Sequence, residues 1–253
     1  MIKFFRHIRL ALINQNQMGK YFKYAIGEIL LVVIGILIAL QINNWNEERK
    51  QNNLEQEYLK ALKTEFENNL NEVDRVIKLN AGLLKSAQKL AQYMGPEIPD
   101  ISDKELSILF FETVSAEVQY RPGSGVTNEI LNSGKLTIFK NGELKNALAS
   151  HDGLLLRIRF QESQELSRLR YKLIDFVEDN VSSRRMAFDA FGELFGVDKG
   201  KFLDSNLHLL TSKKFDNQLA GFMYTSGFLE DRYRELKKQI QRIIKIIDSQ
   251  IKK

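Results

Sequence analysis

The 253-residue sequence contains no cysteine and only three prolines. Without cysteine the chain forms no disulfide and offers no thiolate ligand to a metal. This absence suits a domain outside the reducing cytoplasm, although it does not fix the compartment. The low proline content and the lack of any long alternation of apolar and polar residues argue against a turn-rich β fold. The sequence therefore favours long, uninterrupted helices.

A concentrated basic surface is also missing, although the net charge is +5. Five basic residues and one acidic residue precede residue 29, whereas 32 basic and 31 acidic residues follow it. A nucleic-acid-binding domain concentrates positive charge on its folded part. Here the excess precedes an apolar run, as on the positive flank of a membrane segment. We therefore expect the membrane, and no nucleic acid, as a partner.

The apolar run is AIGEILLVVIGILIALQINNW, residues 25–45. As a helix, its 21 residues would extend roughly 31 Å, close to the ~30 Å hydrocarbon thickness of a bilayer. A buried core helix is disfavoured because apolar residues fill every face from Ile29 to Leu40. A cleaved signal peptide is disfavoured because no small residues mark a cleavage site. We therefore predict a transmembrane signal-anchor over residues 25–45, with aromatic interface anchors at Tyr21, Phe22, Tyr24 and Trp45.

Basic residues also predict the orientation of this span. Those that follow it closely (Arg49, Lys50 and Lys60) are mixed with glutamates, so the stronger positive flank is the preceding one. Residues 1–24 are then a basic amphipathic cytoplasmic segment, and residues 46–253 form a domain across the membrane. In a Gram-negative cell this is a single-pass inner-membrane protein with a periplasmic domain. The topogenic basic residues are Lys3, Arg6, Arg9, Lys20 and Lys23.

A carboxylate stands inside the apolar run. At about 100° per residue, Gly35 and Ala39 fall within roughly 20° of Glu28 on the helix surface. Small residues four apart let two membrane helices approach closely, and an intramembrane carboxylate usually faces a protein partner. One interpretation is therefore a helix–helix contact face made by Glu28, Gly35 and Ala39. The other is that Glu28 lies at the headgroup level, where Lys20 or Lys23 neutralises it.

Beyond the span, apolar residues at three- and four-residue spacing predict further helices. The fold class is all-α, with the transmembrane helix continuing into an antiparallel helical bundle with long helices. Coiling of the first long helix with a copy of itself is an alternative way to cover its apolar stripe. The expected N-caps are Ser102 and Asn141, and Gly134 is an expected helix stop. The expected helices cover the span to about Met94, Ser102 to about Gln119, 127–131, Asn141 to about Asn180, short pieces within 184–211, and about 213–251.

Three segments carry a resemblance: Met1–Arg6, GKYFKYAIGEILLVVIGILIALQINNWNEE at residues 19–48, and ILNSGKLTIFKNGELKNAL at residues 130–148. With these segments the chain resembles a large family of uncharacterised bacterial membrane-anchored proteins, known only as a domain of unknown function. The resemblance implies a single-span architecture. It implies no activity, ligand or catalytic residue.

Residues that could carry chemistry are scattered. The histidines His7, His151 and His208 share no metal-ligand spacing, and His151 lies on an apolar stripe, as a packed histidine would. Gly123-Ser124-Gly125 lacks the lysine of a phosphate loop and is interpreted as a turn. Residues 182–185 have two interpretations, an anion site at the start of a helix or a plain surface loop. We expect no catalytic residue, no metal and no cofactor, and leave a small-molecule ligand open.

These observations favour a membrane-anchored structural or interaction subunit, a scaffold that is not an enzyme. It would self-associate as a homo-oligomer or join another membrane protein. One alternative is a periplasmic sensor or ligand-binding bundle that signals through a partner, because the cytoplasmic segment is too short for an output domain. A second alternative is a channel-like oligomer with Glu28 lining a pore.

Overall fold

The computed structural model describes residues 18–252, and within them the protein is all-α, as the sequence predicts. No strand occurs in this part of the chain. The α-helices are α2 (Met18–Ala91), α3 (Asp103–Val114), α4 (Gly125–Asn132), α5 (Gly142–Phe160), α6 (Ser167–Asn180), α7 (Ser183–Phe191) and α8 (Lys213–Gln250). Shorter turns are the 3-10 helices η1 (Lys135–Ile138), η3 (Leu194–Gly196) and η4 (Asn206–Thr211), and the π-helix η2 (Gln161–Leu166).

The chain divides into two compact units, the N-terminal unit Met1–Glu57 and the C-terminal unit Tyr58–Lys253. In its described part, the N-terminal unit consists of the first portion of α2. The C-terminal unit contains the rest of α2 and all the other helices. The sequence predicts a different division, between a transmembrane helix that ends at residue 45 and a domain that begins at residue 46, and that division stays a prediction.

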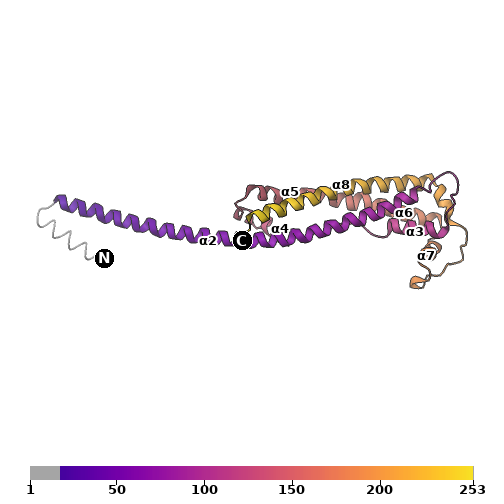
Figure 1. The fold of residues 1–253 in the computed structure, drawn as a ribbon, viewed down its shortest axis with the longest axis horizontal. Coiled ribbons are helices and arrows are strands. Elements are labelled where there is room, and N and C mark those ends of the chain that lie inside the picture. Colours follow the sequence, from indigo (N-terminus) through magenta and orange to yellow (C-terminus); the bar gives the residue numbers. More distant parts are fainter. Residues whose placement is uncertain (1–17, 253) are drawn as a thin grey trace. The chain divides into compact units, whose positions relative to one another are not determined.

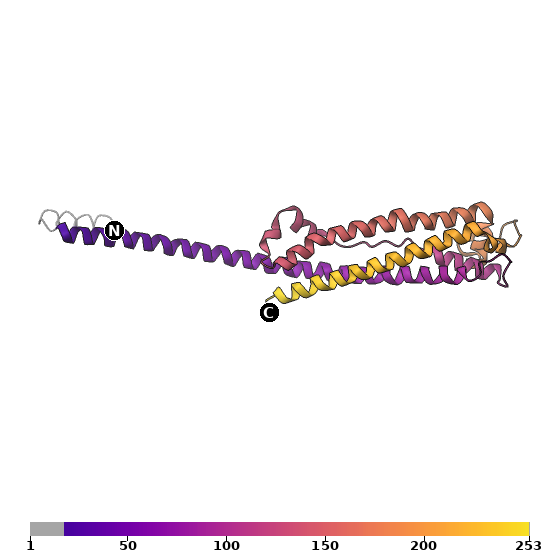
Figure 2. The same ribbon diagram turned by 90° about the horizontal axis from the view of Figure 1, so that it is seen from above.

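In the C-terminal unit, α8 runs antiparallel to two other long helical stretches, the second part of α2 and α5 with α6. Polar contacts fix the direction, because Lys63 of α2 meets Asp248 of α8 at 2.6 Å and Lys237 of α8 meets Asp74 of α2 at 2.6 Å. Figures 1 and 2 both show these stretches side by side, with α4 and the C-terminus at one end of the unit and α7 at the other. The predicted antiparallel bundle is confirmed.

The core of the C-terminal unit is built from apolar residues at helical spacing. A helix repeats every 3.6 residues, so apolar positions three or four apart share one face and pack against the neighbouring helices. On α2 the buried apolar side chains are Leu59, Leu62, Phe66, Val73, Val76, Leu83, Ala87 and Leu90, and α8 contributes Phe215, Leu219, Phe222, Leu229, Tyr233, Leu236, Ile240, Ile243, Ile246 and Ile247.

The predicted N-caps and the predicted helix stop occur in the structure. Ser102 and Asn141 accept hydrogen bonds from the backbone N–H groups of Glu105 and Leu144, which caps α3 and α5. Gly134 follows α4 with a φ of 72°, the left-handed conformation that favours glycine. These caps set where the helices enter and leave the bundle.

Two predicted helices differ in detail. The helix expected from Ser102 to about Gln119 ends at Val114, and the following segment continues along α2 without helical structure and buries Val118 and Tyr120 in the core. The long helix expected from Asn141 ends at Asn180 as predicted, but a π-helical segment separates α5 from α6. A π segment inserts extra backbone into the helix and shifts the faces on either side of it.

Candidate functional site

The apolar stretch of α2 in the N-terminal unit is uncovered. Its large apolar side chains from Ile26 to Ile42 are 45–63% exposed, and none of its most apolar window is buried. Among the described residues, one helical stretch, Phe22–Ala91, is long and apolar enough to cross a membrane by length and composition. A buried core helix would meet the same test, but it would be covered by protein, and this stretch is not.

The predicted anchors and contact residues lie on this helix. Phe22, Tyr24 and Trp45 are exposed, and the Trp45 ring has the Arg49 guanidinium 5.9 Å from its centroid. Lys20 and Lys23 are exposed in the first turns of α2. The Tyr21 side chain and the predicted topogenic residues Lys3, Arg6 and Arg9 lie outside what the structure describes.

Glu28, Gly35 and Ala39 all lie within α2, so helical geometry places them on one face. Gly35 and Ala39 are exposed, and a Cβ added at Gly35 would meet no atom within 4 Å. Glu28 is partly buried. The face is open to an incoming helix, and its role as a contact face stays a prediction.

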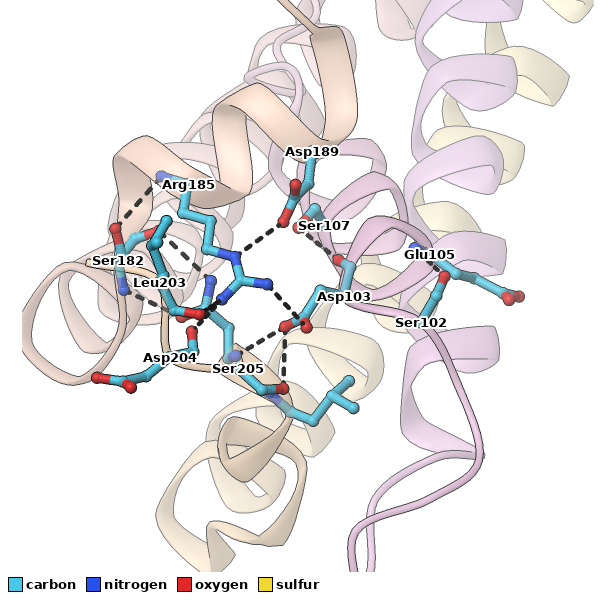
Figure 3. A network of polar contacts seen from close by, with 12 residues as sticks. Ser102, Asp103, Glu105, Ser107, Ser182, Arg185, Asp189, Leu203, Asp204 and Ser205 are labelled. Atoms are coloured by element: carbon cyan, nitrogen blue, oxygen red, sulfur yellow. Dashed lines mark hydrogen bonds and ion pairs between the residues drawn. The ribbon is translucent and has the colours of Figure 1, made fainter. Parts of the chain in front are cut away.

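In the C-terminal unit, a polar cluster joins α3, α7 and the segment before η4 (Figure 3). Arg185 lies in the first turn of α7, which Ser182 caps. Its guanidinium contacts Asp103 at 3.2 Å and Asp189 at 3.4 Å, and also donates to the backbone carbonyls of Leu203 and Asp204. The Arg185 side chain is only 11% exposed. Of the two interpretations of residues 182–185, the plain surface loop is wrong, because Ser182 caps α7 and the next three residues form its first turn. The anion site is disfavoured, because carboxylates and carbonyls of the chain already occupy the Arg185 guanidinium.

Asp103 holds the other side of the cluster. As the first residue of α3, its carboxylate lies where the helix dipole favours negative charge. It accepts hydrogen bonds from the Asn206 backbone N–H at 2.7 Å and the Ser205 hydroxyl at 3.2 Å. The cluster therefore fixes residues 203–206 against two helices.

Residues 192–205 follow α7 and end at the residues that Arg185 and Asp103 hold, and this segment is named the tethered loop. Gly192, Gly196 and Gly200 all adopt positive φ, so its turns need glycine. Arg184 adds a second tie by pairing with Asp198 at 2.6 Å. Within the loop Phe202 is 78% exposed, and Leu194 and Leu203 are also exposed. A loop that displays apolar side chains from a fixed scaffold is suited to binding.

Buried polar groups in the same unit form internal bonds. Glu162 of the π segment is 3% exposed and accepts hydrogen bonds from the Tyr233 hydroxyl at 2.6 Å and the Tyr120 backbone N–H at 2.8 Å. Burial raises the pKa of Glu162, and it also raises the pKa of both tyrosines. The hydrogen bonds oppose the shift at Glu162 but do not reverse it. Sequence periodicity marks this residue only as a glutamate at a position on an apolar stripe.

His151 is buried as expected. Its Nδ1 lies 3.2 Å from the Gln239 side-chain oxygen, and its ring meets the Phe66 ring edge-on at 5.3 Å. Burial lowers the pKa of His151, which favours the neutral imidazole. The histidine therefore ties α5 to α8 and packs on α2.

Residues 121–127 form the predicted loop and the start of α4, and one face of α2 holds them. Asn69 forms a reciprocal pair with Gly123, with both bonds at 2.8 Å, and Glu65 accepts from the backbone N–H groups of Val126 and Thr127 at 2.7 and 3.1 Å. A phosphate loop would need such N–H groups free for its ligand. Here an amide and a carboxylate of the chain already occupy them, so residues 123–125 are no phosphate loop but the end of a loop and the start of α4. No group of three metal-ligating side chains occurs among the described residues.

The fold and these surfaces define an all-α protein in which an uncovered apolar N-terminal helix leads into a helical unit. Residues 28–167 match the model of a family of unknown function, DUF6090. This match covers more than half of the chain, so the protein belongs to that family. No curated protein and no solved structure matches the chain.

Proposed function

We propose that this protein is a membrane-anchored interaction subunit, a scaffold whose helical unit presents binding surfaces beside a bilayer. The uncovered apolar stretch of α2 carries the proposal. Burying one large aliphatic side chain contributes about 1.5–3 kcal/mol, so a helix with such side chains exposed on every face needs a lipid or protein environment. The length of the stretch and its aromatic ends support lipid.

We further propose a bacterial inner-membrane location with the N-terminus in the cytoplasm and residues 46–253 in the periplasm. The excess of basic residues before the span supports this orientation. The segment would act as an uncleaved signal-anchor.

Self-association through the face of Glu28, Gly35 and Ala39 is part of the proposal. The open space around Gly35 supports it, because a second helix is able to approach closely there. A carboxylate within such a contact would be shielded from the hydrocarbon by the partner helix.

The proposed role is binding rather than catalysis. Glu162 and His151, two buried ionisable side chains of the bundle, are engaged in bonds that hold helices together. By contrast, the tethered loop projects Phe202 and Leu203 outward from a firmly held base. Apolar side chains exposed on a fixed loop support an interaction role.

Two measurements test the proposal. Alkaline carbonate extraction should leave the full chain in the membrane pellet, and protease added to spheroplasts should remove the C-terminal unit together with a periplasmic control protein. Recovery of the chain in the soluble fraction would refute the anchor, and protection of the C-terminal unit would refute the orientation.

Self-association has its own test. Crosslinking in membranes should give oligomers of the full chain that Gly35→Leu and Glu28→Ala weaken. The matched change Gly27→Leu, at a glycine off this face whose added Cβ also meets open space, should have less effect. Equal oligomer yields in all four chains would show that the face is not a contact.

A further inference from the structure

A groove runs along the C-terminal unit between α2 and α3. Residues of α2 from Arg75 to Lys89, with Gln92 just after the helix, form one wall, and residues of α3 form the other. Phe191 at the end of α7 also lines the groove. Phe191 is 52% exposed, and its ring centroid lies 4.9 Å from that of Phe111. The large apolar side chains of the lining are Leu79, Leu83, Ile108, Leu109, Phe111 and Phe191.

Positive charge lines the α2 side of this α2–α3 groove. The lining contains four basic side chains (Arg75, Lys78, Lys85 and Lys89) and two acidic ones, Glu105 and Glu112. Both acidic groups are engaged within the chain.

Lys89 lies 3.1 Å from Glu105, and the Ser86 hydroxyl donates to Glu112 at 3.0 Å. In the described part of the chain, Lys78 and Lys85 meet no carboxylate at ion-pairing distance, and both are exposed. They lie seven residues apart and therefore face the same way. The groove thus offers two unpaired ammonium groups along one edge.

The dimensions of the groove favour a helix as its occupant. The groove is open to solvent and has a volume of about 1380 Å³, above the roughly 300–1,000 Å³ of typical small-molecule pockets. The stretch of α2 from Arg75 to Ala91 is roughly 24 Å long at about 1.5 Å per residue, enough for about four turns of a second helix. A concave, apolar channel between two helices is the usual seat of an amphipathic helix.

Gly82 supports this fit. It lies in the interior of α2, lines the middle of the groove and is exposed, and a Cβ added there would meet nothing within 4 Å. Glycine weakens a helix interior, and the packing of the chain itself does not require it at this position. Because Gly82 has no side chain, it exposes the backbone of α2 in the groove, one turn from Ser86. A second helix is able to pack closely against that backbone.

We propose that the α2–α3 groove binds an amphipathic helix of a partner protein, apolar on the face that enters the groove and acidic along the edge beside Lys78 and Lys85. The inference rests on the proposed interaction role and gives it a partner chemistry. The apolar lining supplies the burial, and the two lysines supply direction and selectivity.

Site-specific photocrosslinking on the full chain in its native membrane tests this. A photoreactive amino acid at Gln88, which is exposed in the groove, should yield an adduct whose crosslinked peptide is sequenced by mass spectrometry. The expected peptide belongs to another protein and forms an amphipathic helix with an acidic edge. The same probe at Lys238, exposed on α8 outside the groove, sets the background.

Variants make the result specific. The double variant Lys78→Glu, Lys85→Glu should lower the yield of the adduct about tenfold through like-charge repulsion. The control is Lys238→Glu, Lys245→Glu, an exposed pair with the same spacing on α8, which should leave the yield unchanged. Gly82→Ala and Gly153→Ala each replace a helix-interior glycine whose added Cβ meets open space. Both should raise the melting temperature of the C-terminal unit, but only Gly82→Ala should lower the adduct.

Four outcomes would overturn the proposal: an adduct no stronger than the background at Lys238, an adduct with lipid, one with a second copy of this chain, or one with a basic or non-helical segment. Carbonate extraction and the crosslinking of Gly35→Leu are independent of the groove. A failure here therefore leaves the anchor and its self-association separately measurable.

Discussion

The buried carboxylate Glu162 makes the sharpest stability prediction. It is the common acceptor for two donors from distant parts of the chain, the Tyr233 hydroxyl of α8 and the backbone N–H of Tyr120. Both tyrosines are almost fully buried. If the acceptor is removed, water does not readily replace it.

Two substitutions separate the charge of this group from its hydrogen bonds. Glu162→Ala leaves two buried donors unsatisfied, at about 1–3 kcal/mol each, so we expect a loss of roughly 2–6 kcal/mol in the free energy of unfolding. Glu162→Gln keeps an oxygen acceptor of nearly the same shape without the charge. Its free energy of unfolding should lie within about 1 kcal/mol of the wild-type value at neutral pH. The hydrogen bonds to a neutral amide are weaker, but the amide also avoids the cost of desolvating a carboxylate.

The pH dependence has a definite sign. Because burial raises the folded-state pKa of Glu162 above the ordinary 4.5, the folded chain binds this proton more tightly than the unfolded chain does. The resulting stabilisation is fully present below pH 4.5 and is lost as the pH rises through the folded-state pKa. His151 has the opposite sign, because its lowered pKa removes stability as the pH falls below 6.5. The difference between wild type and Glu162→Gln isolates the glutamate.

Hydrogen exchange of the full chain in detergent, read at the Tyr120 and Tyr233 peptides from pH 4 to pH 8, measures both effects locally. A local probe is needed because the single tryptophan, Trp45, lies in the N-terminal unit. If Glu162→Ala exchanges like the wild type, or if Glu162→Gln keeps the wild-type pH slope, the assignment of Glu162 as a buried, shifted acceptor is wrong.

Three further predictions concern single contacts. Asn80→Ala should cost about 1–3 kcal/mol in urea unfolding because Asn80 and Ser226 are fully buried and bond reciprocally at 3.0 and 2.8 Å. A double-mutant cycle with Ser226→Ala should show at least about 0.5 kcal/mol of coupling, and strict additivity would contradict the pairing. Arg185→Met removes the ion-pair partner of two partly buried aspartates, Asp103 and Asp189, so the free energy of unfolding should fall by about 3 kcal/mol. Trypsin or chymotrypsin should also cut the tethered loop faster in this variant. Unchanged cleavage would show that the cluster does not hold the loop. Asn141→Ala should lower stability by about 1 kcal/mol in thermal unfolding through the lost cap of α5, whereas Asn141→Asp should not.

Most helix boundaries were predictable because their signals are local. Ser102 and Asn141 cap helices within three residues of themselves, and Gly134 stops α4 through its own backbone conformation. The bundle follows from long apolar stripes on three helical stretches, with shorter helices between them. By contrast, the end of α3 depends on Tyr120, whose burial requires partners on α2 and the π segment.

The functional surfaces were harder to predict for the same reason. Glu162 and its tyrosine partners lie 42 and 71 residues apart, and Arg185 lies 82 residues from Asp103. Periodicity does not encode such distances. The α2–α3 groove is equally non-local, since its walls become neighbours only through the turn between them. For the apolar stretch, length and composition carry the prediction, and the proposed contact face remains to be tested.

The polar groups inside the bundle give its helices a unique register. The apolar stripe of α2 repeats every three or four residues, and sliding α8 by one turn would still place apolar side chains opposite one another. Asn69 and Asn80 interrupt that stripe and are almost fully buried. A slip of one turn would separate Asn80 from Ser226 and leave a buried amide and hydroxyl unpaired, at about 1–3 kcal/mol each. Apolar burial therefore supplies most of the driving force, whereas these few polar bonds select one alignment of α2 with α8.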